Sequence, residues 1–467
     1  HLAIMRFALF IRCSLVFVPS NLGVYGFASF YQPPGLRTDA RGRNNRVSMQ
    51  KEDADPEEEA ARSIALANTI LRSLRRRTPA ASLSSPAPLN LETDFYDPST
   101  GLHSEGVWHN CLAGMAAVKL AELQQDEGGQ ENLTAALRMA ESLWGHWDGV
   151  SFQRRSWSGH WDHGTLQEGD EHPPEQPNYY RASSEHRCIQ HGIALLFWSK
   201  LVHHPSLQND SEVCYRCKAQ YKLITKQFLH EYWDDAAENW RTVSKSQGGG
   251  TTARTSASAG TPATGSDAGV AVPYYRAVDQ AVGLLACLEM TTDDAASVAD
   301  VARSTCRTLL VDFGYRNGKE SVTYLGLERN RNLWHDGWVA LALAACARSR
   351  PECWPTASDA HGQVGSLIDD LWTVYGDEDS GTMWHWAKAK KAGCEDGNVR
   401  YCGDNALWYA LCRAARRGSH DAYRPFWNFV HELQANDEDG LVSVADVYGQ
   451  VRLHPNTELA CLVLWPI

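Results

Sequence analysis

A sixfold internal repeat constrains the fold of this chain more than any other feature. Each unit begins with a turn that carries aromatic and Gly residues, continues through polar residues, and enters a helix of small apolar residues. The six helix starts read, in chain order, Trp108-His109-Asn110, Glu185-His186-Arg187, Val278-Asp279-Gln280, Trp334-His335-Asp336, Gly403-Asp404-Asn405 and Asn456-Thr457-Glu458. Because a repeat fixes the architecture, six equivalent helices are expected to present these polar residues to one shared cavity.

Longer amphipathic segments separate the apolar helices. They repeat apolar residues at i, i+3, i+4 and i+7, which is typical of a helix with one buried face. We expect these outer helices at about residues 57–76, 131–144, 212–232, 294–313, 362–375 and 421–433. Since a helix that is apolar on every face is buried, six outer–inner pairs predict an all-α (α/α)6 toroid, with short hairpin-like loops at one rim.

The N-terminal residues are not expected to belong to the toroid. A short basic start and an apolar run of about a dozen residues make residues 1–29 similar to a signal peptide. Residues 30–56 begin at Phe30, after which Arg37, Arg41, Arg43 and Arg46 are opposed only by Asp39. Together they resemble the bipartite presequence of algae with secondary plastids, which implies import into a plastid; plain secretion and a retained membrane anchor are the alternatives. The toroid is expected over 57–467, interrupted by a Gly/Ser/Thr-rich surface loop at 244–269.

The composition narrows the class of function. The formal net charge is −12, and no long basic stripe lies outside the N-terminal segment, so nucleic-acid binding is not expected. The 17 Trp residues suit a large core, and indole faces also stack on sugar rings. The 13 cysteines are scattered through helical patterns and are expected to be small buried thiols.

The chain resembles the six-hairpin glycosidase-like superfamily over about residues 57–467. The resemblance is carried by Asp97-Pro98-Ser99-Thr100-Gly101-Leu102 followed by Trp108-His109-Asn110, which is similar to repeats of alpha-1,6-mannanase-like and unsaturated-glucuronyl-hydrolase-like members. It implies that the rim at which the inner helices begin is the substrate face. The superfamily also contains sugar epimerases, isomerases and lyases, so the resemblance indicates architecture more than activity.

Three aspartates are the candidate catalytic acids, because glycoside cleavage uses two carboxyl groups across the scissile bond. Asp279, Asp336 and Asp404 each stand beside the start of an apolar run. Asp336 is the first choice, since Trp334-His335-Asp336-Gly337-Trp338 is similar to the helix start that carries a catalytic Asp in unsaturated glucuronyl hydrolases. The paired Asp-Asp of alpha-1,6-mannanases corresponds to Val278-Asp279 here. A structural role stays open for each acid, because Asp is a preferred helix cap.

Histidines offer a second chemistry, because imidazole transfers protons near neutral pH. His335 and His186 are added to the candidate catalytic residues, and superfamily epimerases use histidines to move a proton beside a carbonyl. The residues expected to bind substrate are Trp108, His109, Asn110, Arg276, Trp334, Trp338, Trp384 and His454.

Three functions therefore remain open at this point. The first is a glycoside hydrolase with paired carboxylates, the second a sugar epimerase or isomerase that uses His186, His335 or His454, and the third a non-catalytic toroid that binds a glycan or a protein. The expected partner is a saccharide. No metal, no cofactor, no nucleic acid and, once the presequence is removed, no membrane are expected.

Overall fold

A computed structural model describes the chain over residues 56–76, 96–97, 102–103, 107–124, 127–152, 186–209, 211–246, 275–290, 295–313, 332–355, 359–378, 380–385, 399–415, 420–434, 444–446, 451–452 and 457–465. The chain divides into two compact units, residues 1–51 and 52–467, and every described residue lies in the second. The predicted presequence up to residue 55, residues 247–269 of the loop predicted at 244–269, and His454 lie outside the described residues, and what was expected of them stays a prediction.

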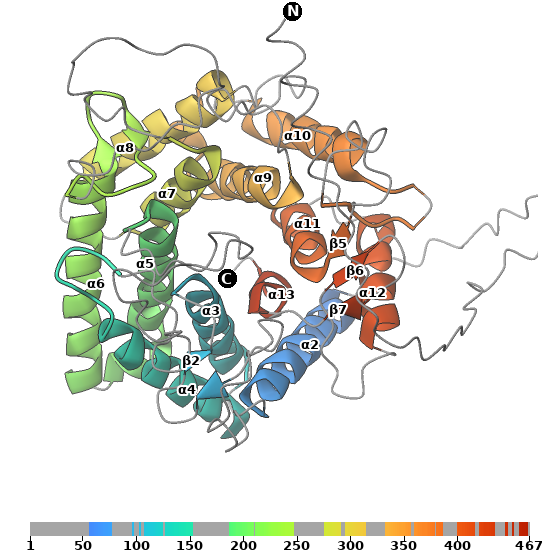
Figure 1. Cartoon of the computed structure of the whole chain (residues 1–467), viewed down its shortest axis with the longest axis horizontal. Helices are drawn as coiled ribbons and strands as arrows, with labels where there is room; N and C mark the ends of the chain where they lie inside the picture. The colour runs from blue at the N-terminus through green and yellow to red at the C-terminus, as the bar shows by residue number, and fades with distance from the viewer. Residues whose placement is uncertain are drawn as a thin grey trace, which may run out of the picture. The chain divides into compact units, whose positions relative to one another are not determined.

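Six inner helices form a closed ring. In chain order they are α3 (Val107–Leu123), α5 (Cys188–His203), α7 (Ala277–Glu289), α9 (Leu333–Ser349), α11 (Cys402–Ala414) and α13 (Thr457–Leu462). Each contacts the next, and α13 returns to contact α3, so that the last repeat closes against the first (Figure 1). Helices three places apart, such as α3 and α9, therefore lie on opposite sides of the ring.

Six outer helices surround the ring (Figure 1). They are α2 (Pro56–Arg76), α4 (Glu127–Trp144), α6 (Ser211–Tyr232), α8 (Ala295–Arg307), α10 (Ala360–Tyr375) and α12 (His420–Gln434). A π-helical turn, η3 (Thr308–Asp312), extends α8. Each outer helix packs against one or two inner helices. The predicted (α/α)6 toroid is confirmed.

Short strands make up the loops between helices. β1 (Tyr96–Asp97) pairs with β2 (Leu102–His103), and β3 (Trp233–Asp234) pairs with β4 (Asn239–Trp240), both antiparallel. A three-stranded sheet contains β5 (Val399–Tyr401), β6 (Val444–Asp446) and β7 (Val451–Arg452). Two 3-10 turns, η2 (Pro205–Asn209) and η4 (Pro351–Cys353), follow α5 and α9. These hairpins are the predicted loops that lead into the inner helices.

Small residues let the layers approach closely. A Cβ added at Gly283 in α7 would lie 2.4 Å from the indole nitrogen of Trp240, which is itself fully buried. The same indole donates to Thr305 of α8 at 2.9 Å, so Trp240 joins the β3–β4 hairpin to both layers. The small-residue character of the inner helices is therefore a packing requirement, because any larger side chain there would displace a buried ring.

The first outer helix closes the outer layer through a buried carboxylate. Glu59 of α2 accepts hydrogen bonds from the Tyr409 hydroxyl (2.5 Å) and from the Trp427 indole (2.7 Å), which lie on α11 and α12. The two ends of the chain are thus held together in both layers.

Two further sequence expectations can be compared with the structure. Every cysteine in the described ranges is buried and none forms a disulfide, including Cys214 and Cys217 of the C-x-x-C motif. Within the same ranges, no helix combines the length and the hydropathy that a membrane span requires.

Candidate functional site at the N-terminal rim

The first turns of the inner helices gather at one end of the ring, here called the N-terminal rim. Because successive helix residues are rotated by about 100°, the second, third and fourth residues of each inner helix point in three different directions. Contacts of the second residue lie on the ring axis in α3, α9 and α13, those of the third lie on a hairpin residue in α7 and α11, and those of the fourth lie on a hairpin backbone or an outer helix in α7, α9 and α11.

The fourth residue anchors the structure between the layers. In α7 it is Gln280, whose amide accepts from the backbone nitrogen of Trp240 (2.8 Å) and donates to its carbonyl (2.7 Å). In α11 it is Asn405, which holds Met383 in the same way (2.9 and 3.1 Å). These amides fix the hairpins to the helices that follow them.

Asp336 occupies this fourth position in α9. Its Oδ2 accepts a 2.6 Å hydrogen bond from the hydroxyl of Tyr375, on outer helix α10, and the residue is 1% exposed. Asn110, predicted to bind substrate, is the fourth residue of α3 and is equally buried. Both side chains therefore belong to the interior between the layers.

Asp279 and Asp404 are the third residues of their helices, and each is held by a hairpin residue. Asp279 accepts from the hydroxyl of Thr242 (2.7 Å) and forms an ion pair with Arg276 (2.7 and 3.0 Å). Asp404 Oδ2 lies 2.6 Å from Nδ1 of His385. Because a carboxylate oxygen accepts hydrogen bonds, Nδ1 of His385 is the donor in this pair.

Thr242 and His385 occupy equivalent places in two repeats. The carbonyl of Thr242 accepts the first N–H of α5, from Cys188 (3.0 Å), and the carbonyl of His385 accepts the first N–H of α9, from Leu333 (2.8 Å). In one repeat the aspartate is therefore hydrogen-bonded to a hydroxyl group, whereas in the other it is hydrogen-bonded to an imidazole. The second of these two repeats therefore contains a His–Asp pair where the first has a Thr–Asp pair.

His335 is the third residue of α9 and completes this part of the rim. Burial, with a smaller contribution from electrostatic interactions with Arg276 and His385, lowers its pKa to about 3. Arg276 precedes α7 and His385 pairs with Asp404 of α11, and both groups act electrostatically on His335 of α9. His335 is therefore a neutral imidazole at neutral pH.

The second residues meet on the ring axis. The indole nitrogens of Trp108 in α3 and Trp334 in α9 both donate to Oε1 of Glu458, the second residue of α13 (2.8 and 3.0 Å). The rings of Trp108 and Trp334 are 5.6 Å apart although their helices lie on opposite sides of the ring, and Trp338 packs on Trp108 at 5.2 Å. An indole cluster with one carboxylate therefore fills the axis below the rim.

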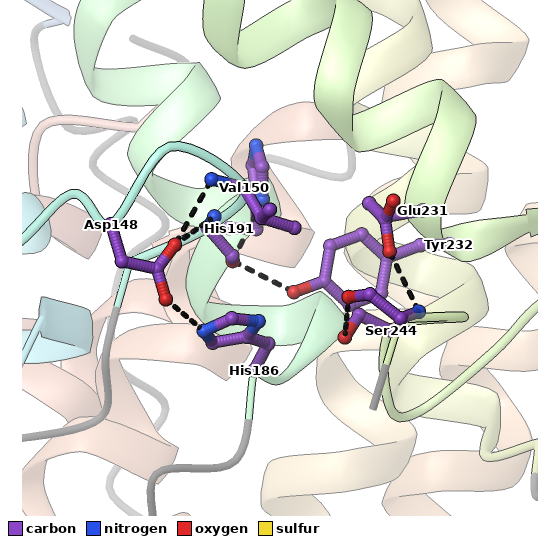
Figure 2. Close-up of polar contacts among 9 residues, drawn as sticks. Asp148, Val150, His186, His191, Glu231, Tyr232 and Ser244 are labelled. Carbon is purple, nitrogen blue, oxygen red and sulfur yellow. Dashed lines mark hydrogen bonds and ion pairs between the residues drawn. The ribbon is translucent and has the colours of Figure 1, made fainter. Parts of the chain in front are cut away.

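A second His–Asp pair precedes α5. His186 Nε2 lies 2.5 Å from Asp148 Oδ2, and Figure 2 shows the two side chains turned toward each other. Burial would raise the pKa of Asp148, but backbone N–H groups of Ser151 and Val150, together with His186, hold it below its ordinary value. Asp148 is therefore ionised, and His186 is oriented by it.

The neighbouring network in Figure 2 is buried and structural. His191, the fourth residue of α5, donates from Nε2 to the carbonyl of Ile224 (3.0 Å), so its Nδ1 accepts from Ser151 (2.9 Å), which in turn accepts from Tyr232 (2.8 Å). Burial lowers the pKa of His191 to about 3.

Two further predicted residues, His109 and Trp384, are chain neighbours of Trp108 and His385 but make separate contacts. His109 Nδ1 is 3.1 Å from the Thr457 hydroxyl, at the junction of α3 and α13. The ring of Trp384 is covered by Arg400, whose guanidinium carbon is 4.1 Å from the ring centroid and which pairs with Asp377 at 2.6 Å. Trp384 is thus a stacking platform for a protein side chain.

Sequence reasoning missed three groups that the structure brings into the site. Glu458 belongs to the sixth helix start, Asn456-Thr457-Glu458, and this position in the repeat was the sequence feature that could have identified it as a rim residue. His385 and Asp148 lie in hairpins, and only the later pairing with Asp404 and His186 distinguishes them from ordinary turn residues. Among the described residues, no group of three His, Cys, Asp or Glu side chains could hold a metal ion.

Solved structures with similar architecture include three carbohydrate enzymes. A D-mannose isomerase superposes with a TM-score of 0.54 at 11% identity, covering 89% of this chain and 100% of that one. A sugar epimerase from a ruminal bacterium gives a TM-score of 0.54 at 10% identity (87% and 97% covered), and a GH76 alpha-mannanase from Bacteroides thetaiotaomicron gives 0.51 at 11% (88% and 97%). The chain has the six-hairpin toroid fold. No protein-family model and no curated protein matches its sequence.

Proposed function

We propose that this six-hairpin toroid is a sugar isomerase or epimerase, which moves a proton on the carbon beside a sugar carbonyl. The observation that carries the proposal is the His385–Asp404 pair, which lies at the N-terminal rim near His335 and Arg276. Two of the similar structures are named as an isomerase and an epimerase, so the toroid fold is compatible with this chemistry.

In this proposal His385 is the base. Asp404 accepts the Nδ1 proton and holds the ring, so that Nε2, on the opposite side of the imidazole, takes a proton from the sugar carbon. The C–H electrons then move to the carbonyl oxygen, which becomes an enolate. Neutral His335 donates a hydrogen bond to that oxygen, and the guanidinium of Arg276 stabilises its charge. Return of the proton to the former carbonyl carbon, while the hydroxyl proton of the first carbon passes to the enolate oxygen, gives the isomer. Return of the proton to the first carbon, after the intermediate has turned its other face to His385, gives the epimer.

The carboxylates support this chemistry better than glycoside cleavage by the predicted pair. Cleavage needs one carboxyl group to protonate the leaving oxygen and another to activate water or attack the sugar. Asp279, Asp336 and Asp404 are each at most 2% exposed, and each accepts hydrogen bonds from its own protein partner. Their surroundings favour positioning roles.

Glycoside hydrolysis remains a second candidate because of one observation. Glu458 places a half-buried carboxylate among indole rings, and indole faces suit a sugar ring. The GH76 alpha-mannanase has the same fold. Release of reducing ends from an oligosaccharide panel, lost in Glu458→Gln, would support this candidate in place of proton transfer.

The proposal is tested by incubating the full chain with free aldoses and ketoses and separating the products by chromatography. We expect interconversion of at least one pair, and a loss of about 100-fold or more in His385→Gln and Asp404→Asn, as is typical for removal of a general base. The matched control is His361→Gln, which changes an exposed histidine on α10. Wild-type turnover by His385→Gln, or no conversion of any sugar by the wild type, would overturn the proposal.

A further inference from the structure

Glu458 stands out from the other acids of the rim by the groups that hold it. Its Oε1 accepts from two uncharged donors, the indoles of Trp108 and Trp334, and no cation among the described residues forms an ion pair with it. Asp279, by contrast, is paired with Arg276, and Asp404 with His385. In the part of the chain that the structure describes, Glu458 is therefore a rim carboxylate held by uncharged donors.

The second carboxylate oxygen has space made for it by the neighbouring helix. A Cβ added at Gly403, the second residue of α11, would lie 2.6 Å from Glu458 Oε2. Glycine at this axis-facing position lets the carboxylate lie over α11. The two indoles fix one oxygen, so that the orientation of the other is fixed as well.

We propose that Glu458 is a specificity-determining residue that selects uncharged sugars against phosphorylated or carboxylated ones; this rests on the proposed isomerase or epimerase function. A fixed carboxylate accepts hydrogen bonds from sugar hydroxyls, whereas a phosphate or carboxylate group near it is repelled, since like charges at a poorly solvated site are strongly unfavourable. The substrate class is a neutral aldose or ketose.

The test compares a neutral hexose with the same hexose carrying a 6-phosphate, using the full chain. Binding is followed by tryptophan fluorescence, because Trp108 and Trp334 contact the residue in question, and turnover by product separation. We expect the wild type to prefer the neutral sugar by at least tenfold in kcat/KM and in affinity. Glu458→Gln should reduce that preference about tenfold, mainly through KM, while Glu212→Gln, an exposed change in α6, leaves it unaltered.

Two further variants keep the proposal falsifiable if Glu458→Gln fails to fold. Trp108→Phe removes one donor but keeps the charge, so it should raise KM for neutral sugars without restoring binding of the phosphate. Gly403→Ala should displace the carboxylate and lower the preference. Equal binding of both sugars by the wild type, or an unchanged preference in Glu458→Gln and Gly403→Ala, would overturn the inference. Because binding is measured separately, selective binding without turnover would contradict only the proposed reaction.

Discussion

At the scale of single residues, the same carboxylate serves different purposes according to its hairpin partner. Asp279 and Asp404 occupy the third place of their helices, yet Thr242 donates to one and His385 to the other. The partners are 37 and 19 residues away in sequence. Helix patterning predicts where the acids stand, because they belong to the repeat, but it cannot predict a contact made across a hairpin of variable length.

Asp336 tests this distinction, because it stands one residue later in its helix than Asp279 and Asp404 do in theirs. A shift of one residue turns a side chain by about 100°, which directs Asp336 toward Tyr375 in α10. Asparagine preserves the acceptor for the Tyr375 hydroxyl. We therefore expect Asp336→Asn to keep turnover within about threefold of the wild type, measured beside Asp404→Asn, which loses about 100-fold. A large loss in Asp336→Asn with intact folding would return this residue to the chemistry.

A buried histidine with a lowered pKa makes the free energy of unfolding depend on pH. The pKa of His191 falls from 6.5 to about 3 on folding, so the unfolded chain binds its proton first as the pH decreases. Stability is then fully present above about pH 6.5 and is lost progressively toward pH 3, by about 2 kcal/mol at pH 5 for this residue. Urea unfolding at pH 7 and pH 5 measures the loss, which should shrink in His191→Gln and persist in His361→Gln. Equal pH dependence in both variants would contradict it.

At the scale of elements, the fourth residue of an inner helix acts as a clamp on the preceding hairpin. Gln280 satisfies both backbone groups of Trp240, and Asn405 does the same for Met383. The bounds of the outer helices were predicted to within a few residues from apolar spacing, since that spacing is set by burial. The direction in which each first-turn side chain points was not predicted, because it depends on the exact residue at which the helix begins.

Removal of one clamp should destabilise the protein without altering the rim directly. Gln280→Leu leaves the backbone N–H and carbonyl of buried Trp240 without their partner, which costs about 2–4 kcal/mol. Gln130→Leu, an exposed change on α4, is the matched control and should shift the urea midpoint little. A midpoint for Gln280→Leu equal to that of the control would show that the hairpin does not depend on the amide.

At the scale of the whole molecule, the ring is closed by contacts between the first and last repeats. Trp108 and His109 reach Glu458 and Thr457 in the inner layer, and Glu59 reaches α11 and α12 in the outer layer. The repeat predicts that closure occurs, because six equivalent pairs leave no free edge. It does not predict the residues that close the ring, since those contacts join the two ends of the chain.

The role of Glu59 in closing the outer layer can be tested by comparing two substitutions of this residue. Glu59→Leu leaves the Tyr409 hydroxyl and the Trp427 indole without an acceptor and should cost about 2–3 kcal/mol, while Glu59→Gln retains an acceptor and should cost less than half as much. Limited proteolysis should cut the leucine variant faster near α2. Identical unfolding midpoints for the two variants would contradict a closing role.

The central claim, that the rim moves a proton on a sugar carbon, is tested most directly by hydrogen exchange. The full chain is incubated in D2O with a free neutral hexose, and the proton on the carbon beside the carbonyl is followed by NMR. We expect loss of that signal with wild-type protein, and a rate of loss at least 100-fold lower in His385→Gln. Full retention of the signal with every hexose tested, or loss at the same rate in His385→Gln, would contradict it.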